Sequence, residues 1–125
     1  MDDGARREVV IVADNRETLD GLQTYLSEAG LVPRCTCELV RRKTLISDRT
    51  LAVILFPDDY EWSDVTHELD NVEARLARVL LVLVTAHPQR CQAMTMTAKR
   101  EIVIVPRPVW GWTILDAIRA HREGG

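Results

Sequence analysis

Polar side chains follow the apolar runs of this chain, each at the point where a run ends. They are Asp14, the pair Asp58 and Asp59, the hydroxyl of Thr85 and the guanidinium of Arg107. Carboxylates hold divalent cations such as Mg²⁺, and a hydroxyl together with a cation stabilises the oxygens of a phosphoryl group. If one sheet brings these run ends to the same edge, the residues are equipped for phosphoryl or anion chemistry.

Short apolar runs alternate with amphipathic segments along the whole chain. Such runs are typical of strands that are covered on both faces. The expected strands are 9–13, 32–37, 51–56, 79–84 and 102–105. The expected helices are 15–30, 38–47, 63–76, 89–98 and a last one around 114–118. Strands alternating with helices of this length predict a parallel sheet with helices on both faces, joined by right-handed crossovers.

The first helix has the clearest boundaries. Its apolar residues Leu19, Leu22 and Leu26 recur at spacings of three and four, which is typical of one buried helix face. Asn15 belongs to the residue types that cap helix N-termini, and Gly30 to those that end helices. We therefore expect a helix between these two residues.

The composition is that of an ordinary globular domain. Of 125 residues, 46% are hydrophobic and 28% are charged, and the net charge is -3. These values predict one domain over 1–125, with a core of about 8–122, and no basic surface for nucleic acid or an anionic membrane. The chain opens with acids, and no apolar run approaches the roughly 20 residues that span a bilayer, so we expect a cytoplasmic protein.

The cysteines are Cys35, Cys37 and Cys91, an odd number. We expect them to be reduced thiols, as is usual in a cytoplasm. The three histidines form no metal-ligand spacing with them, so the sequence predicts no metal site of this kind.

Two motifs give the chain a family resemblance. Val84-Thr85-Ala86 closes one apolar run, and Val105-Pro106-Arg107-Pro108 closes the next. A small hydroxyl residue followed by alanine, and then a cation followed by proline, resembles the last two strands of the response-regulator receiver domain, of which the chemotaxis regulator is an example. The resemblance covers essentially residues 8–122. It implies the flavodoxin-like, doubly wound α/β fold, with a five-stranded parallel sheet in the order 2-1-3-4-5 and five helices, and a place in bacterial two-component signalling.

The chain departs from the receiver pattern at its centre. Receivers place a phosphate-accepting aspartate at the end of the third strand, where this chain has Phe56. The acidic pair after the first strand is reduced to Ala13-Asp14, and Ile104 stands where receivers often carry a switch aromatic. We therefore expect a degenerate pseudo-receiver that is not an enzyme and binds no metal or cofactor. Its residual pocket would consist of Asp14, Asp58, Thr85 and Arg107.

A displaced acceptor is the second hypothesis. Asp58 and Asp59 follow the vacated position, and a shifted loop would bring either carboxylate close to Asp14 and Arg107. Asp14 and Asp58 would then hold Mg²⁺, and the protein would accept phosphate from a histidine kinase or a small phosphodonor. The competing structural interpretation is a polar turn, because aspartate stabilises turns through its own backbone hydrogen bonds.

The aromatic residues indicate a candidate partner interface. Trp110 and Trp112 lie at the start of the last helix, where two positions are separated by about 200° of rotation, so at least one indole should be exposed. Tryptophan is enriched at interface hot spots, and Met94 and Met96 on the preceding helix add adaptable apolar surface. The resemblance places a protein partner or a second copy on the face of the fourth helix, fifth strand and fifth helix. The alternative is that the indoles pack within the domain.

These observations favour a receiver-like signalling domain that acts by phosphorylation-independent protein–protein interaction. The phosphoaccepting receiver is the alternative. An unrelated small enzyme or ligand-binding protein on the same fold ranks third, because the sequence contains no glycine-rich phosphate loop and no nucleophile with a partner base. A small anion held by Arg107 and Thr85 in place of phosphate also remains open.

Overall fold

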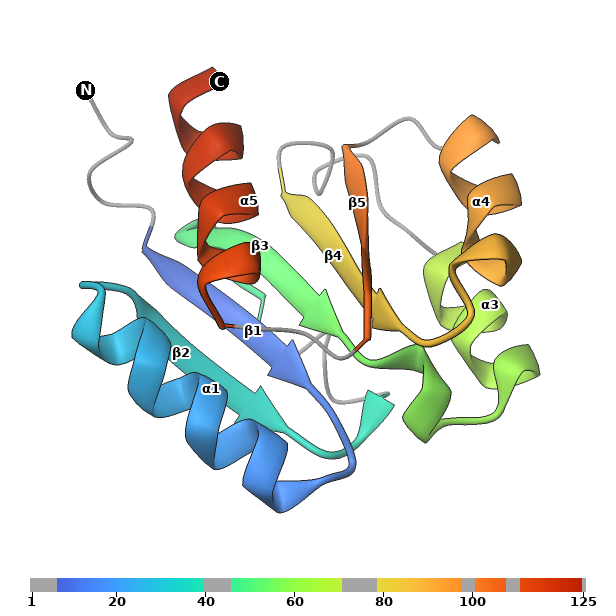
Figure 1. The fold of residues 1–125 in the computed structure, drawn as a ribbon, viewed down its shortest axis with the longest axis horizontal. Coiled ribbons are helices and arrows are strands. Elements are labelled where there is room, and N and C mark those ends of the chain that lie inside the picture. Colours follow the sequence, from blue (N-terminus) through green and yellow to red (C-terminus); the bar gives the residue numbers. More distant parts are fainter. Residues whose placement is uncertain (1–6, 40–45, 71–78, 98–100, 108–110, 125) are drawn as a thin grey trace.

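Five parallel strands form one sheet in the order β2-β1-β3-β4-β5 (Figure 1). The computed structural model describes residues 7–39, 46–70, 79–97, 101–107 and 111–124. The strands are β1 (Glu8–Val12), β2 (Val32–Thr36), β3 (Thr50–Leu55), β4 (Leu80–Thr85) and β5 (Ile102–Pro106). The predicted α/β fold and strand order are confirmed.

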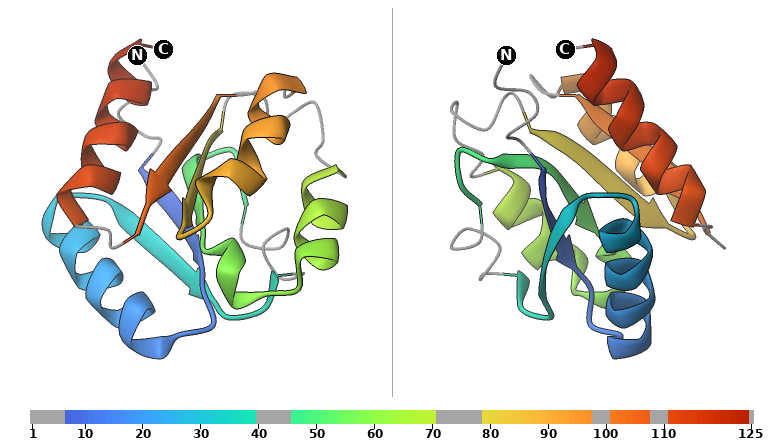
Figure 2. Two further views of the ribbon diagram at one scale, coloured as in Figure 1. Left: turned by 45° about the vertical axis from the view of Figure 1, so that its right-hand side comes forward. Right: turned by 90° about the vertical axis from the view of Figure 1, so that its left-hand side faces the viewer.

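Helices cover both faces of this sheet (Figure 2). On one face lie α1 (Arg16–Glu28) and α5 (Gly111–Gly124), and on the other lie α3 (Trp62–Asp70) and α4 (Pro88–Thr97). A short 3₁₀ helix, η3 (Pro57–Asp59), follows β3.

Within the described ranges there are four α-helices, where the sequence predicts five. Most of the expected second helix, 38–47, falls on residues 40–45, which lie outside those ranges. The same holds for the part of the expected third helix beyond residue 70. No helix among the described residues has the length and apolar character needed to cross a membrane.

The core explains why the central strands read as continuous apolar runs. Every residue of β3 and β4 is buried, because each strand has helices above and below it. Alternate side chains enter two clusters: Ile54 and Val82 pack under α1 and α5, whereas Leu55 and Leu83 pack under α3 and α4. Each large side chain buried in this way contributes roughly 1.5–3 kcal/mol of hydrophobic stabilisation.

The boundaries of α1 are those that the sequence predicts. The side chain of Asn15 accepts a hydrogen bond from the backbone N–H of Thr18 at 3.1 Å, which caps the helix. Gly30 has a φ angle of 91°, a left-handed conformation that favours glycine and lets the chain turn into β2.

Strand register brings the carboxyl ends of the strands to one edge. Val12 pairs with Leu55, Leu55 pairs with Leu83, and Thr85 pairs with Pro106. In open parallel sheets, ligands bind at this edge. The residues that follow the strands are therefore the place to look for a site.

Candidate functional site

The polar residues at or just beyond the carboxyl ends of β1, β3, β4 and β5 meet at this edge of the sheet. Backbone hydrogen bonds fix their positions: the N–H of Phe56 donates to the carbonyl of Val12 at 3.0 Å, and the N–H of Arg107 donates to the carbonyl of Thr85 at 3.2 Å. The ends of neighbouring strands are thus tied together. Side chains that follow them can contact one another although they are far apart in the sequence.

Asp58 makes the central contact of the site. Its Oδ1 accepts a hydrogen bond from the hydroxyl of Thr85 at 2.6 Å, and its Oδ2 accepts one from the backbone N–H of Ala86 at 2.7 Å. The Thr85 oxygen also accepts a hydrogen bond from the backbone N–H of His87 at 2.9 Å, which orients the buried hydroxyl. We call the Thr85 hydroxyl and the Ala86 N–H the anion seat, since two donors converge there on one carboxylate.

The electrostatics of Asp58 favour its ionised form. Burial alone would raise the pKa of its carboxyl and is the largest single influence. The hydrogen bonds from Thr85 and Ala86, together with the electrostatic influence of His87 and Arg107, outweigh burial and lower the pKa of Asp58 below its ordinary value. Asp58 therefore fills the anion seat as a carboxylate near neutral pH.

Asp59 faces the first strand. Its Oδ2 accepts a hydrogen bond from the backbone N–H of Asp14 at 2.9 Å. Two consecutive carboxylates of η3 thus tie the end of β3 in opposite directions, one to β4 and one to the end of β1. The polar turn expected of these residues is present, and each acid anchors it to a neighbouring strand.

Phe56 occupies the position at which the receiver resemblance places an acceptor. Only 2% of it is exposed, and its side chain lies in the cluster under α1 and α5. The guanidinium of Arg107 lies over its ring at 5.9 Å from the centroid. A phenyl ring is not a nucleophile, so this position provides an apolar surface and a platform for a cation.

The structure brings Asp58, Thr85 and Arg107 to one region, and it joins Asp14 to them through Asp59. Among the residues that the structure describes, no group of three or more metal-ligating side chains is placed to hold a metal ion. The thiols of Cys35, Cys37 and Cys91 are free.

Two contributions to the site were not expected from the sequence. One is the backbone N–H of Ala86, because a main-chain donor carries no signal in the residue type. The other is Tyr60, whose hydroxyl donates a hydrogen bond to the carbonyl of Cys37 at 2.8 Å and links the loop after η3 to the end of β2. Burial, reinforced by the charges of Asp14 and Asp59, raises the pKa of Tyr60, so this donor stays protonated.

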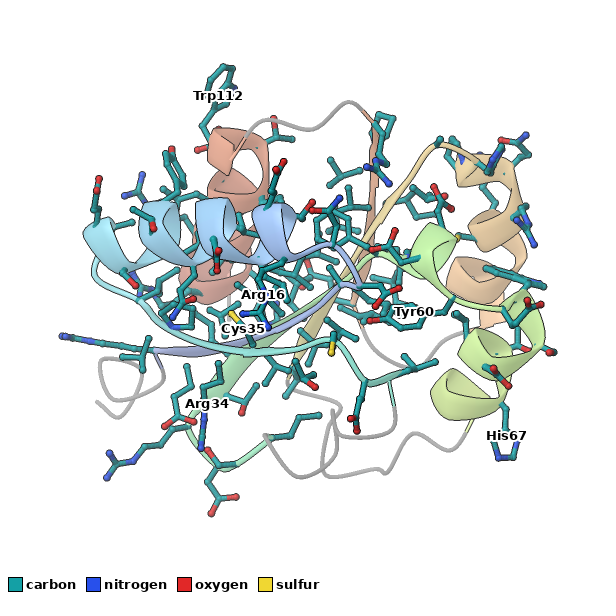
Figure 3. The ribbon with its side chains drawn as sticks, turned by 90° about the horizontal axis from the view of Figure 1, so that it is seen from below. Arg16, Arg34, Cys35, Tyr60, His67 and Trp112 are labelled. Atoms are coloured by element: carbon teal, nitrogen blue, oxygen red, sulfur yellow. The ribbon has the colours of Figure 1, made fainter. Side chains whose placement is uncertain are left out.

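The candidate partner interface is described in part. Trp112 is 54% exposed and projects from the start of α5 away from the body of the molecule (Figure 3). Met94 and Met96 belong to α4, but their side chains lie outside the described residues, as does the whole of Trp110.

No protein-family model matches the sequence, and no curated protein matches it. Solved structures do match its fold. A response regulator receiver domain protein from Clostridium thermocellum aligns over 94% of both chains with a TM-score of 0.72 at 13% identity. A response regulator receiver protein from Burkholderia phymatum aligns over 93% of this chain and 94% of that chain, with a TM-score of 0.67 at 18% identity.

A third similar structure is the non-phosphorylated HemR receiver domain from Leptospira biflexa. It covers 92% of this chain and 93% of its own, with a TM-score of 0.65 at 13% identity. These likenesses show that the chain has the fold of receiver domains.

Proposed function

We propose that this chain is an atypical receiver-like signalling domain that acts by protein–protein interaction without being phosphorylated. The observation that carries the proposal is the seating of the Asp58 carboxylate on the Thr85 hydroxyl and the Ala86 N–H. Receiver-like chemistry needs such donors for phosphoryl oxygens, which develop negative charge during transfer. Here a resident carboxylate already takes both.

The residue at the acceptor position supports the same conclusion. Phe56 is buried in the core and stacks with Arg107, so the cation that would balance phosphoryl charge lies over an apolar ring. The acceptor position thus holds no nucleophile, and the donors that would bind phosphoryl oxygens are bound by Asp58 instead. The packing of the fold is unchanged. A domain in this state transmits information through its surface and its partners.

The displaced-acceptor alternative makes different demands on the same residues. If Asp58 were the nucleophile, its oxygens would have to leave the anion seat, so that the donors could turn to the phosphoryl group. Asp59 would have to release the backbone N–H of Asp14. Phosphorylation of either aspartate would therefore first break at least one hydrogen bond to a charged carboxylate. Such a bond contributes roughly 1.5–3 kcal/mol to stability.

Intact mass spectrometry after incubation with acetyl phosphate and Mg²⁺ tests the proposal. We expect no mass increase of one phosphate in the wild-type protein. The matched comparison is between Asp58→Asn, Asp59→Asn and Asp64→Asn, the last of which alters an exposed acid on α3. An adduct that survives in Asp64→Asn but disappears in either of the other two variants would replace the proposal with a working phosphoreceiver.

Contact with a protein partner or with a second copy is the second half of the proposal. Trp112 supports it, because exposed large aromatic side chains are enriched at interface hot spots. The surface that includes α4, β5 and the start of α5 is the proposed site of contact.

A further inference from the structure

A groove separates α1 from α5 beside the carboxyl ends of β3 and β5. Its volume is about 730 Å³, which lies within the range of roughly 300–1,000 Å³ that is usual for small-molecule sites. Its floor is apolar and consists of Leu22, Phe56 and Ile114, all of them buried. The remaining lining residues are Glu17, Thr18, Gly21, Tyr25, Arg107 and Gly111.

Arg107 places a positive charge on the lining of this groove. Its guanidinium lies over the Phe56 ring, and within the described part of the chain its side chain makes no hydrogen bond or ion pair. The planar guanidinium presents donors that match a carboxylate in a bidentate arrangement. A ligand anion can therefore bind Arg107 without displacing an existing ion pair.

Gly21 keeps one wall of the groove open. It lies in the middle of α1, where glycine is less favourable than alanine. A Cβ atom at this position would meet nothing within 4 Å, so packing does not require the glycine. What the missing side chain provides is open space beside Leu22.

Gly111 has a different role on the opposite wall. A Cβ atom here would lie 2.9 Å from Cδ2 of Tyr25, closer than two carbon atoms can pack. The glycine therefore lets the start of α5 approach the tyrosine ring, which forms an aromatic side of the groove. With Phe56 in the floor, two aromatic rings face the same space.

We propose that this groove binds a small monocarboxylate with an aromatic body, such as an arylacetate. The carboxylate would pair with Arg107, and the ring would lie on Phe56 and Leu22 beside Tyr25. Arg107 offers a partner for one carboxylate, whereas Glu17, which also lines the groove, would repel a second negative charge on the ligand. The proposal does not rest on the proposed function, since the groove and the anion seat use different donors.

The residue at the vacated acceptor position is what creates this site. An aspartate at position 56 would bring a carboxylate to Arg107 and remove the apolar floor. Phe56 supplies the floor and leaves the guanidinium available to an external anion. The same residue that removes the phosphate acceptor thus makes the groove suitable for an amphipathic ligand.

Titration of the ¹⁵N-labelled full chain with phenylacetate, and separately with indole-3-acetate, tests the proposal by NMR. We expect saturable shifts of the Gly21 and Gly111 amide signals. The neutral probe phenylacetamide should bind at least about tenfold more weakly than phenylacetate, because it lacks the charge that Arg107 recognises. Absence of saturable binding of both acids at millimolar concentration would overturn the proposal, and so would equal affinity for the amide.

Two variants locate the binding. Gly21→Leu fills the open wall and should abolish phenylacetate binding without lowering the thermal midpoint, because leucine favours a helix more than glycine does. Gln23→Leu adds the same side chain at an exposed position of α1 that does not line the groove, and it should bind as the wild type does. Arg107→Gln should reduce the preference for phenylacetate over phenylacetamide to about one. Unchanged binding by Gly21→Leu would show that the ligand lies elsewhere.

The mass-spectrometric test of phosphorylation is read independently of this titration. If the wild-type protein gains a phosphoryl group and also binds phenylacetate saturably, the proposed function alone is rejected. If it gains no phosphoryl group and does not bind phenylacetate, the ligand site in the groove alone is rejected.

Discussion

Asp58 is a polar side chain whose two oxygens hold together the ends of two strands. Asparagine has one oxygen and one NH₂ group where aspartate has two oxygens. Because NH₂ cannot accept a hydrogen bond, either the Thr85 hydroxyl or the Ala86 N–H would lose its acceptor. We expect Asp58→Asn to lower the free energy of unfolding by about 1–2 kcal/mol at neutral pH, the lower part of the range for hydrogen bonds to a charged group, because Asp58 is half-buried. Urea denaturation measures this difference. Asp64→Asn should change it by less than about 0.5 kcal/mol.

The lowered pKa of Asp58 makes that contribution depend on pH. The folded state binds the Asp58 proton less readily than the unfolded chain, whose aspartate pKa is about 3.9. The contribution is therefore complete above the unfolded pKa and is lost as pH falls through the folded pKa. Urea denaturation between neutral and acid pH should show the wild-type protein and Asp58→Asn converging at the acid end. A gap that stays constant would mean that Asp58 does not titrate in this way.

Acids after the third apolar run were evident from the sequence, but their partners were not. Asp58 and Asp59 differ by one position, yet they contact β4 and the end of β1, respectively. The direction in which each side chain points depends on the single turn of η3. No periodic pattern encodes such a turn, and the Ala86 N–H belongs to a residue whose side chain carries no chemistry.

At the scale of elements, the contact between α1 and α5 depends on Gly111. A methyl group at this position would press against the Tyr25 ring, so Gly111→Ala should lower the free energy of unfolding by roughly 1 kcal/mol or more, as overpacking does. The same substitution in a Tyr25→Ala background should be neutral or slightly stabilising. Urea denaturation of the four proteins completes a double-mutant cycle. Additive effects would show that the two residues do not press on each other.

The elements themselves follow closely from sequence patterns. Asn15 and Gly30 mark the two ends of α1 because capping and left-handed turns require particular residue types. One strand boundary could not be predicted from apolar residues alone, because β3 begins at the polar Thr50, one residue before the apolar run. Thr50 is buried, and its hydroxyl accepts a hydrogen bond from the backbone N–H of Ser47 at 2.8 Å, so a polar residue extends the strand.

The groove is the part of the molecule that sequence patterns could not reveal. Its lining comes from α1, α5 and the ends of β3 and β5, and it depends on Gly21 and Gly111, which are far apart in the chain. Apolar periodicity identifies residues that face the core. It does not identify the places where two helices stand apart.

The proposed contact surface of the whole molecule leads to a prediction for Trp112, which is 54% exposed. We expect Trp112→Ala to weaken binding of the protein partner or second copy by more than about 1 kcal/mol, and to lower the free energy of unfolding by clearly less than it weakens binding. Urea denaturation and sedimentation equilibrium measure the two quantities. Val32→Thr is the matched control, because Val32 is 51% exposed but lies on β2, at the far edge of the sheet. Equal losses of stability and binding would make Trp112 a packing residue.

The two edges of the sheet restrict how copies of this domain can meet. β2 forms one edge and contains Pro33 and Arg34, and β5 forms the other and ends at Pro106. Proline has no N–H to donate to an incoming strand, and a charged side chain on an edge strand disfavours pairing with another chain. Direct pairing of one copy's edge strand with another's is therefore disfavoured at both edges, and contact between copies is expected to use side chains rather than strand addition. We therefore expect concentrated protein to resist the joining of its sheets into fibres.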